Sequence, residues 1–307
     1  MAESRYGLLL AGGAYVLWGF LPAYLKLLAQ LAPTEILAHR IVWSLAFCSA
    51  LLALRGGWAP LLHRLRQPRV LGWFVLSAAC LSVNWLLYIW AVNTGQVVEG
   101  SLGYFIIPIV NAAFGVLLLG ERLRAAQVTA FALAAAGAAY LTVAYGQFPW
   151  IGLTLALTFG VYGLLRKRAA LESLPGLTLE MAMVSPVALG YLFVLGLLGE
   201  GTFGRADWSL HALLLAAGPV TAVPLLLFAA GIRRVALTTL GVLQYLGPSI
   251  QFLLGVFAYG EPFNLHRLIG FCLIWVAMAI FAAEGLLRYR TVDAARAARA
   301  ERQMASG

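Results

Sequence analysis

A long apolar segment occurs twice in this chain, and the repetition limits the folds that the chain can adopt. Residues 101–123 read SLGYFIIPIVNAAFGVLLLGERL, and residues 239–263 read TLGVLQYLGPSIQFLLGVFAYGEPF. At an offset of 140 residues the matched positions are Pro108 and Pro248, Gly115 and Gly255, Tyr104 and Gln244, and Asn111 and Gln251. Internal repeats of membrane helices are typical of transporters, in which the substrate site lies between the halves.

Apolar stretches of similar length recur along the whole chain. Hydrophobic residues make up 62% of the 307 residues and charged residues 11%, against about 45–50% and about 25% in soluble domains. About 20 apolar residues suffice to cross the hydrocarbon core of a bilayer. We therefore predict an all-α membrane protein with ten transmembrane helices, near residues 6–28, 34–54, 70–92, 98–119, 125–144, 149–166, 178–199, 210–231, 238–259 and 264–287.

Basic residues gather in every second loop. Of the 21 Lys and Arg residues, 17 fall at the N-terminus, in alternate loops or in the C-terminal tail, against Arg205 and Arg267 in the remaining loops. Lys and Arg collect on the cytoplasmic side of membrane proteins, so both termini are predicted to be cytoplasmic. The net charge of +9 could indicate a nucleic-acid partner, but the basic residues follow the membrane topology, so we expect none.

The orientation implies that the two halves of the chain are inverted. Each half holds five predicted helices, an odd number, so matching helices cross the bilayer in opposite directions. We predict a first five-helix repeat at 1–146, a second at 147–287 and a cytoplasmic tail at 288–307. Inverted repeats have two nearly equivalent conformations, open to opposite sides of one site. The sequence therefore predicts a central cavity and alternating access.

Polar and aromatic residues recur on one face of several predicted helices. An unpaired polar group in hydrocarbon is costly, so amide and phenol groups must face protein or a wet cavity. In the helices near 98–119 and 238–259 such groups share one face at spacings of four, three and four residues. We expect the cavity to be lined by Trp18, Asn84, Tyr88, Tyr104, Asn111, Tyr162, Gln244, Tyr245 and Gln251.

Four prolines inside the predicted membrane helices are candidates for flexible positions. Proline removes one backbone N–H and leaves a carbonyl of the preceding turn without its partner. We therefore predict hinge or gating roles for Pro22, Pro108, Pro224 and Pro248. Gly115 and Gly255 fit close helix packing better than binding, because small residues let helices approach each other.

Four ionisable residues cluster around the turn between the first two predicted helices: Lys26, Glu35, His39 and Arg40. One interpretation is structural, with Glu35 paired to Arg40 or Lys26 at the headgroup level. In the other, Lys26 or Arg40 holds a substrate carboxylate and His39 titrates near neutral pH. Both remain open, and Lys26, His39 and Arg40 join the predicted binding residues.

Several kinds of chemistry have no support in the sequence. The three cysteines, Cys48, Cys80 and Cys272, are too scattered for a metal set, and no phosphate-binding or zinc-binding motif occurs. No nucleophile, base and orienting partner can be assembled, so we expect no enzymatic activity, cofactor or metal. We also expect no Asp or Glu at mid-membrane depth, which argues against proton coupling through a carboxylate.

Six segments carry a resemblance to a known family: WGFLPAYLK (18–26), TEILAHRIVWS (34–44), NWLLYIWAVN (84–93), EGSLGYFIIPIVN (99–111), FGVYGLLRK (159–167) and TTLGVLQYLGPS (238–249). The chain resembles the RarD group of EamA-domain transporters in the drug/metabolite transporter superfamily. The resemblance implies ten helices in two inverted EamA repeats in the bacterial inner membrane. The related YddG branch implies export of amino acids, including aromatic ones.

We therefore expect a monomeric exporter of small metabolites, with membrane lipids around it and neutral or aromatic amino acids as substrates. A drug-like compound of the chloramphenicol type is an alternative substrate, and uptake is an alternative direction. A channel and a membrane-embedded enzyme are further alternatives from other classes. Saturable exchange in proteoliposomes separates a transporter from a channel.

Overall fold

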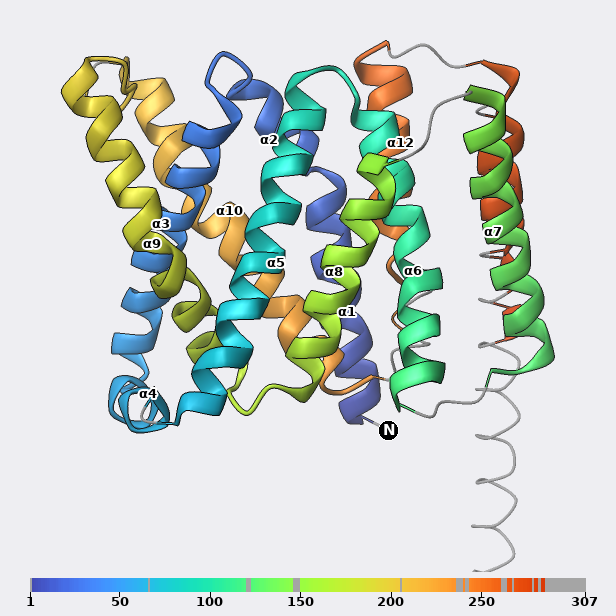
Figure 1. Ribbon diagram of the computed structural model, residues 1–307, viewed down its shortest axis with the longest axis horizontal. Helices are drawn as coiled ribbons and strands as arrows, with labels where there is room; N and C mark the ends of the chain where they lie inside the picture. Colours follow the sequence, from blue (N-terminus) through green and yellow to red (C-terminus); the bar gives the residue numbers. More distant parts are fainter. Residues whose placement is uncertain are drawn as a thin grey trace, which may run out of the picture. The chain divides into compact units, whose positions relative to one another are not determined.

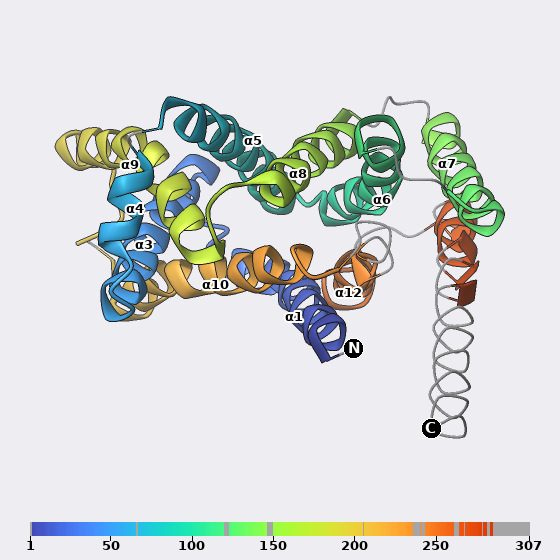
Figure 2. The same cartoon turned by 90° about the horizontal axis from the view of Figure 1, so that it is seen from below.

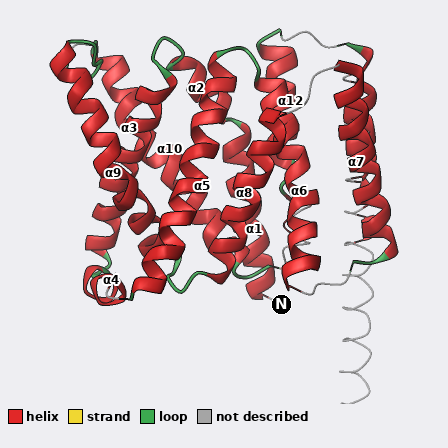
Figure 3. Ribbon diagram, in the orientation of Figure 1, coloured by secondary structure: helices red, strands yellow, loops and turns green. Residues whose placement is uncertain are grey.

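The computed structural model describes residues 2–65, 67–119, 123–145, 150–204, 206–235, 240, 243–260, 264–266, 268–277, 279–280 and 283–284. Every regular element within these ranges is a helix (Figure 3). The chain forms two compact units, one of Met1–Phe114 with Pro149–Pro262 and one of Gly115–Phe148 with Phe263–Gly307. The predicted tail at 288–307 lies outside the described residues.

Helices follow one another closely along the chain. In order they are α1 (Ala2–Gly19), α2 (Leu21–Leu27), α3 (Pro33–Leu54), α4 (Trp58–Leu65), α5 (Pro68–Asn93), α6 (Val97–Leu119), α7 (Ala125–Tyr145), α8 (Trp150–Arg168), α9 (Ser173–Leu198), α10 (Trp208–Ile232), α12 (Leu246–Leu253) and the π-helix η1 (Leu254–Ala258). Proline stands at the first position of α3 and α5, where its missing N–H would have had no partner in the helix.

Five of the described helices are long and apolar enough to cross a membrane: Arg5–Leu27, which joins α1 and α2, Pro33–Leu54, Val70–Asn93, Ser173–Leu198 and Trp208–Ile232. Shorter apolar helices occur at Gly103–Leu118, Ala125–Tyr140, Leu246–Ala258 and Leu268–Ala277. The all-helical membrane architecture is thus confirmed for the described part of the chain. The count of ten spans and the side on which the termini lie stay predictions.

Within the first unit, matching helices of the two halves run in opposite directions (Figure 1). Helix α1 starts at the end where the N-terminus lies, whereas α8 ends there. The pairs α3 and α9, α5 and α10, and α6 and α12 are opposed in the same way. Viewed along the helices, α5, α8 and α6 form one row and α10, α1 and α12 form another (Figure 2). The candidate site lies between these rows.

Two of the expected continuous helices are interrupted. The first breaks at Phe20, between α1 and α2, because Pro22 at the second position of α2 has no N–H to continue the ladder. The ninth breaks at Gln244 and Tyr245, which form a turn before α12. Gln244 therefore precedes the helix instead of sharing its face with Gln251, and Pro248 stands in the first turn of α12, where no N–H is needed.

Helix α10 packs closely against α3 and begins at a side-chain cap. A Cβ built on Gly218 would collide with the backbone carbonyl of Trp43, so this contact admits only glycine without rearrangement. The Asp207 carboxylate caps α10 by accepting the N–H of Leu210 at 3.1 Å. This N–H, together with the Ser209 hydroxyl, holds the pKa of Asp207 below its ordinary value.

The second unit contains α7 and the short helix Leu268–Ala277. Their close approach is at Gly137, where a Cβ would lie 3.0 Å from the carbonyl oxygen of Gly270. Tyr140 and His266 share a hydrogen bond of 2.9 Å, and Arg124 pairs with Glu284. The glycine contact and the two polar pairs hold this unit together.

Candidate functional site

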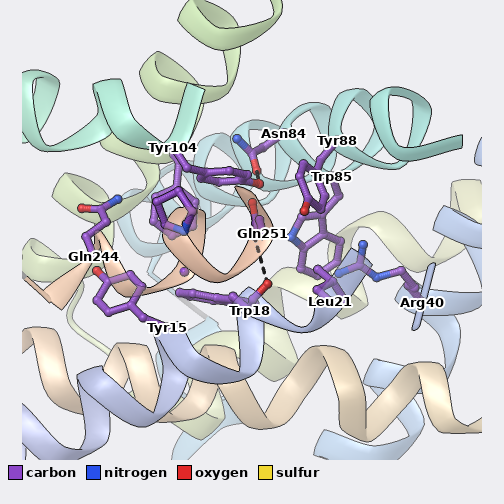
Figure 4. Close-up of a pocket in the computed structure, with 13 residues that line it drawn as sticks. Tyr15, Trp18, Leu21, Arg40, Asn84, Trp85, Tyr88, Tyr104, Gln244 and Gln251 are labelled. Carbon is purple, nitrogen blue, oxygen red and sulfur yellow. Dashed lines mark hydrogen bonds between the residues drawn. The ribbon is translucent and has the colours of Figure 1, made fainter. Parts of the chain in front are cut away.

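A narrow cavity lies in the middle of the first unit, between the two rows of helices (Figure 4). Its volume is about 40 Å³, room for about three water molecules. Residues of α1, α2, α3, α5, α6, α8 and α12, and the turn before α12, contribute to it. The lining residues are Tyr15, Trp18, Leu21, Arg40, Asn84, Trp85, Tyr88, Tyr104, Phe159, Gln244, Gly247, Pro248 and Gln251.

Half of the predicted site residues line this cavity. These are Trp18, Arg40, Asn84, Tyr88, Tyr104, Gln244, Pro248 and Gln251. The other eight are not among its lining residues: Lys26, His39, Asn111, Tyr162 and Tyr245 of the predicted binding residues, and Pro22, Pro108 and Pro224 of the predicted hinges. Their roles in binding or gating stay predictions.

Aromatic rings from both repeats form one wall of the cavity. The ring centroid of Trp18 lies 5.6 Å from that of Phe159, at an interplanar angle of 87°, and 5.7 Å from that of Tyr15. Trp18 and Phe159 are repeat partners at an offset of 141 residues. Such edge-to-face pairs contribute about 0.5–1.5 kcal/mol beyond the burial of their surface. The wall can therefore be well ordered and still offer ring faces to an apolar group.

Hydrogen bonds orient the amide of Asn84 toward the cavity. Its Nδ2 donates to the carbonyl oxygen of Leu155 at 2.9 Å and to the Thr158 hydroxyl at 3.0 Å. Its Oδ1 accepts the Tyr104 hydroxyl at 3.3 Å, as Figure 4 shows. Because both amide protons are used on α8, the oxygen is the end that is presented to Tyr104 and the cavity.

Gln251 uses the backbone carbonyl that Pro22 leaves free. In a regular helix the N–H of residue 22 would bond to the carbonyl of Trp18, but proline has no N–H. Gln251 Nε2 donates to this Trp18 oxygen instead, at 2.9 Å (Figure 4). The break in the first predicted helix therefore becomes a contact between the two repeats.

A second contact between the repeats joins Asn111 to Gln244. Asn111 Nδ2 donates to Gln244 Oε1 at 3.1 Å, and both side chains are buried. Asn111 thus orients an amide that lines the cavity, although it does not line the cavity itself.

Arg40 is the only cationic residue of the cavity lining. Its Nε donates to the Thr221 hydroxyl at 2.9 Å, and its guanidinium carbon lies 4.6 Å from the centre of the Trp85 ring. The side chain is 1% exposed, and Nη1 has no hydrogen-bond partner among the described residues. A buried guanidinium without a carboxylate beside it favours an anionic ligand, since a buried charge needs a partner.

The predicted cluster of four ionisable residues is not a unit. The described residues contain no ion pair of Glu35, so the Glu35–Lys26 and Glu35–Arg40 pairs are absent there. Glu35 instead accepts the backbone N–H of Thr202 at 2.8 Å, and the Lys26 ammonium lies 5.4 Å from the centre of the Tyr259 ring. The buried His39 packs against Phe203. The turn before Pro33 separates Lys26, in α2, from the other three residues. Those three share α3, where successive residues point in different directions around the helix.

Sequence reasoning did not assign five of the lining residues to the site: Tyr15, Leu21, Trp85, Phe159 and Gly247. A signal existed for Phe159, which is the repeat partner of Trp18, and for Tyr15, which shares a helix face with Trp18. Trp85 and Leu21 are apolar residues in apolar helices, and nothing in the sequence distinguishes them from residues that face lipid.

One buried carboxylate was not considered from the sequence, and the expectation of no Asp or Glu at mid-membrane depth stays a prediction. Glu180 lies in α9 and is fully buried. Its Oε1 accepts the Ser77 hydroxyl and lies 3.7 Å from Nη1 of Arg166 in α8. The sequence reading placed the start of this helix near residue 178, whereas α9 begins at Ser173, so Glu180 is inside the helix and not at its edge.

The cavity thus combines ring faces, amide groups and one guanidinium. No group of His, Cys, Asp and Glu among the described residues is arranged to hold a metal ion. Such a lining can hold a small solute that carries a carboxylate and an apolar side group, by pairing the first with Arg40 and stacking the second on the rings.

Comparison with known proteins identifies the family of the chain. The sequence model of the EamA-like transporter family matches residues 5–143 and again residues 149–283. Protein RarD of Streptomyces exfoliatus is 49% identical over 92% of this chain and 90% of its own length. Protein RarD of Escherichia coli (strain K12) is 42% identical over 94% of this chain and 97% of its own length.

More distant similarities point the same way. The Chloramphenicol-sensitive protein RarD of Pseudomonas aeruginosa is 33% identical over 91% of this chain and 94% of its own length. A solved crystal structure with 22% identity covers 90% of this chain and 98% of its own, at a TM-score of 0.62, and shares the fold. The chain therefore belongs to the EamA-like transporter family, as a multi-pass transporter of the bacterial inner membrane.

Proposed function

We propose that the chain exports neutral or aromatic amino acids by alternating access around the cavity. The observation that carries this proposal is Arg40, a buried guanidinium without an acidic partner among the described residues. An amino acid brings the missing carboxylate. Its side chain would stack on Trp18 and Phe159, and its ammonium group would lie among ring faces and the amide oxygens of Asn84 and Gln251.

The present cavity is too small for such a solute. Sites for small molecules occupy about 300–1,000 Å³, far above the cavity volume of about 40 Å³. In this proposal the structure corresponds to a closed state, with Trp18, Phe159 and Gln251 lining a space too small for the solute. Entry of a substrate requires the two rows of helices to separate, as transporters with inverted repeats do.

The unpaired guanidinium also separates the leading substrate class from the alternative. A compound of the chloramphenicol type has an aromatic ring but no carboxylate, so it would stack on the rings and leave Arg40 without a partner. The name of the Pseudomonas relative keeps this compound as a competitor to be tested.

Counterflow in proteoliposomes tests the proposal. Liposomes with purified protein are loaded with unlabelled L-phenylalanine, and uptake of labelled L-phenylalanine is followed. Saturable counterflow should be blocked by excess L-tryptophan and by 3-phenylpropionate, which keeps the carboxylate, but much less by phenethylamine, which lacks it. Equal competition by phenethylamine, or by chloramphenicol alone, would contradict the proposal.

Substitution of Arg40 gives the matched residue test. Arg40→Gln should raise the L-phenylalanine concentration at half-maximal transport by about 10- to 100-fold, because a charge-assisted hydrogen bond contributes about 1.5–3 kcal/mol. The control is Arg55→Gln, which removes the exposed arginine that follows the same helix. If both variants transport like the unmodified protein, Arg40 does not hold the substrate.

A further inference from the structure

Glu180 occupies the position of the second repeat that corresponds to Arg40 in the first. Helix α3 begins at Pro33 and α9 at Ser173, and at this offset of 140 residues Arg40 matches Glu180. The two helices run in opposite directions in Figure 1. The inverted repeat therefore carries a cation at one of two equivalent positions and a carboxylate at the other.

Only one of these two positions faces the cavity. Arg40 lines the cavity, whereas Glu180 is 0% exposed and does not line it. In a transporter with inverted repeats, the opposite-facing state arises when each half takes the geometry of the other. In that state Glu180 would take the place that Arg40 holds now, and its carboxylate would come to line the cavity.

Glu180 and Arg166 form a loose ion pair, and binding of a proton to the carboxylate would remove its negative charge. Arg166 Nη1 lies 3.7 Å from Oε1, too far for a direct hydrogen bond, and Oε2 has no hydrogen-bond partner among the described residues. The ionisable and polar groups that face the carboxylate are Arg166 and Tyr162 from α8, Ser77 from α5 and Cys48 from α3. Helix α10 also packs on α9, but its one ionisable residue is His211, in its first turn at the opposite end.

Arg166 keeps other partners when Glu180 is neutral. Its Nη2 donates to the carbonyl oxygen of Ser173 at 3.2 Å, and its guanidinium lies 5.6 Å from the centre of the Phe74 ring. It also stands in the last turn of α8, where the helix dipole favours a cation. Binding of a proton to Glu180 therefore does not leave Arg166 as an isolated buried charge.

Aromatic side chains connect Glu180 to the cavity. Tyr162, beside the carboxylate, stacks on Phe228 with ring centroids 6.3 Å apart and packs on Phe159 at 5.8 Å. Phe159 lines the cavity and contacts Trp18. The rings of Tyr162 and Phe159 thus link Glu180 to the proposed substrate site, and a change in the charge of Glu180 can act on the site through them.

We propose that Glu180 is the proton-binding site that couples transport to a pH gradient across the membrane. The proton comes from water on one side of the membrane and binds a carboxylate oxygen of Glu180 in the state in which this side chain lines the cavity. It leaves to water on the other side when the two halves change state, so each cycle carries a proton across. Carboxylates inside membrane helices typically serve such relays. The inference rests on the proposed function for its transport assay, but the proton site has a readout of its own.

Transport driven by a pH gradient tests the coupling. In proteoliposomes with labelled L-phenylalanine, an imposed pH gradient should drive accumulation several-fold above the equilibrium level. Glu180→Gln should lower this accumulation to the equilibrium level while counterflow continues, because exchange moves no net proton. The matched control is Glu172→Gln, which removes the exposed carboxylate before the same helix and should accumulate like the unmodified protein. Gradient-driven accumulation in Glu180→Gln would overturn the inference.

Infrared spectroscopy tests the proton site without any substrate. During a pH titration of the purified full chain, the carbonyl-stretch region should contain a component from the Glu180 carboxylic acid in addition to those of the other carboxyl groups. This component should be present in the unmodified protein and in Glu172→Gln and missing in Glu180→Gln. Glu180→Asp should shift the band, and it serves if Glu180→Gln does not fold. A band unchanged in both Glu180 variants overturns the inference. If L-phenylalanine shows no counterflow but the Glu180 band is present, the proposed substrate fails and the proton site stands.

Discussion

At the scale of single residues, the candidate site depends on groups that regular helices would have used internally. Pro22 deprives the Trp18 carbonyl of its helix donor, and Gln251 supplies a donor from the other repeat. Asn84 Nδ2 donates to the Leu155 carbonyl and the Thr158 hydroxyl of α8, and the amide oxygen accepts the Tyr104 hydroxyl. In each case a side-chain amide forms hydrogen bonds with groups that lie far away in the sequence.

The bond between Gln251 and Trp18 leads to a stability prediction. Gln251→Leu should lower the free energy of unfolding by about 1–3 kcal/mol, because the buried carbonyl then has no donor. Pro22→Ala restores a backbone N–H and should recover part of this loss in the double variant. The measurement is the thermal unfolding midpoint in detergent. Gln30→Leu, at an exposed turn position, is the control, and an equal midpoint for the Gln251 and Gln30 variants would disprove the role of the bond.

At the scale of elements, glycine sets how closely the helices approach each other. Gly218 of α10 faces the backbone of Trp43 in α3, and Gly103 of α6 approaches Gly152 of α8 closely enough that a Cβ would lie 2.8 Å from its Cα. Because backbone cannot move aside as a flexible side chain does, these positions fix the spacing of α3 from α10 and of α6 from α8.

Gly218→Ala should therefore destabilise the protein by about 1–3 kcal/mol through overpacking against α3. The matched control is Gly190→Ala in α9, which has no atom within 4 Å of the added Cβ and should be neutral or stabilising by up to about 1 kcal/mol, since alanine favours the helix. Thermal unfolding of both variants in the same detergent gives the comparison. The packing argument is wrong if Gly218→Ala melts at or above the temperature of Gly190→Ala.

At the scale of the whole molecule, the placement of basic residues predicts the orientation in the membrane. The Arg-rich loops lie at one set of alternate positions in the sequence, and the cytoplasmic side collects such residues. Helices α3 and α9 run in opposite directions, so they end at opposite ends of the first unit (Figure 1). The exposed Arg55 follows α3 directly, and the exposed Glu200 lies two residues after α9. They report on the two sides of the membrane.

Labelling of intact cells checks this orientation. In a chain with Cys48, Cys80 and Cys272 replaced by Ser, a membrane-impermeant maleimide should label Glu200→Cys in intact cells. Arg55→Cys should be labelled only after the cells are opened. The reverse pattern would show that the termini lie outside, and labelling of both in intact cells would show that the two ends do not lie on opposite sides.

The repeat made part of the site predictable. Tyr104, Gln244 and Gln251 could be predicted to line the cavity because polar residues recur at matched positions of two apolar segments. Lys26 and His39 were grouped with Arg40 by proximity along the chain. Lys26 lies in α2 before the turn at Pro33 and approaches Tyr259, whereas His39, next to Arg40 in α3, packs against Phe203. Adjacent residues of a helix point about 100° apart, so proximity in sequence does not determine which neighbours a side chain meets.

The sequence by itself determined that this chain spans a membrane as two related halves, because apolar length, charge placement and an internal repeat are all properties of residue order. Only the tertiary structure decided which polar residues meet. The Arg40–Thr221, Gln251–Trp18 and Glu180–Arg166 contacts join different helices, and they depend on the rotation of each helix about its axis. That rotation is set by close packing and by helix breaks, which a pattern of hydrophobicity does not encode.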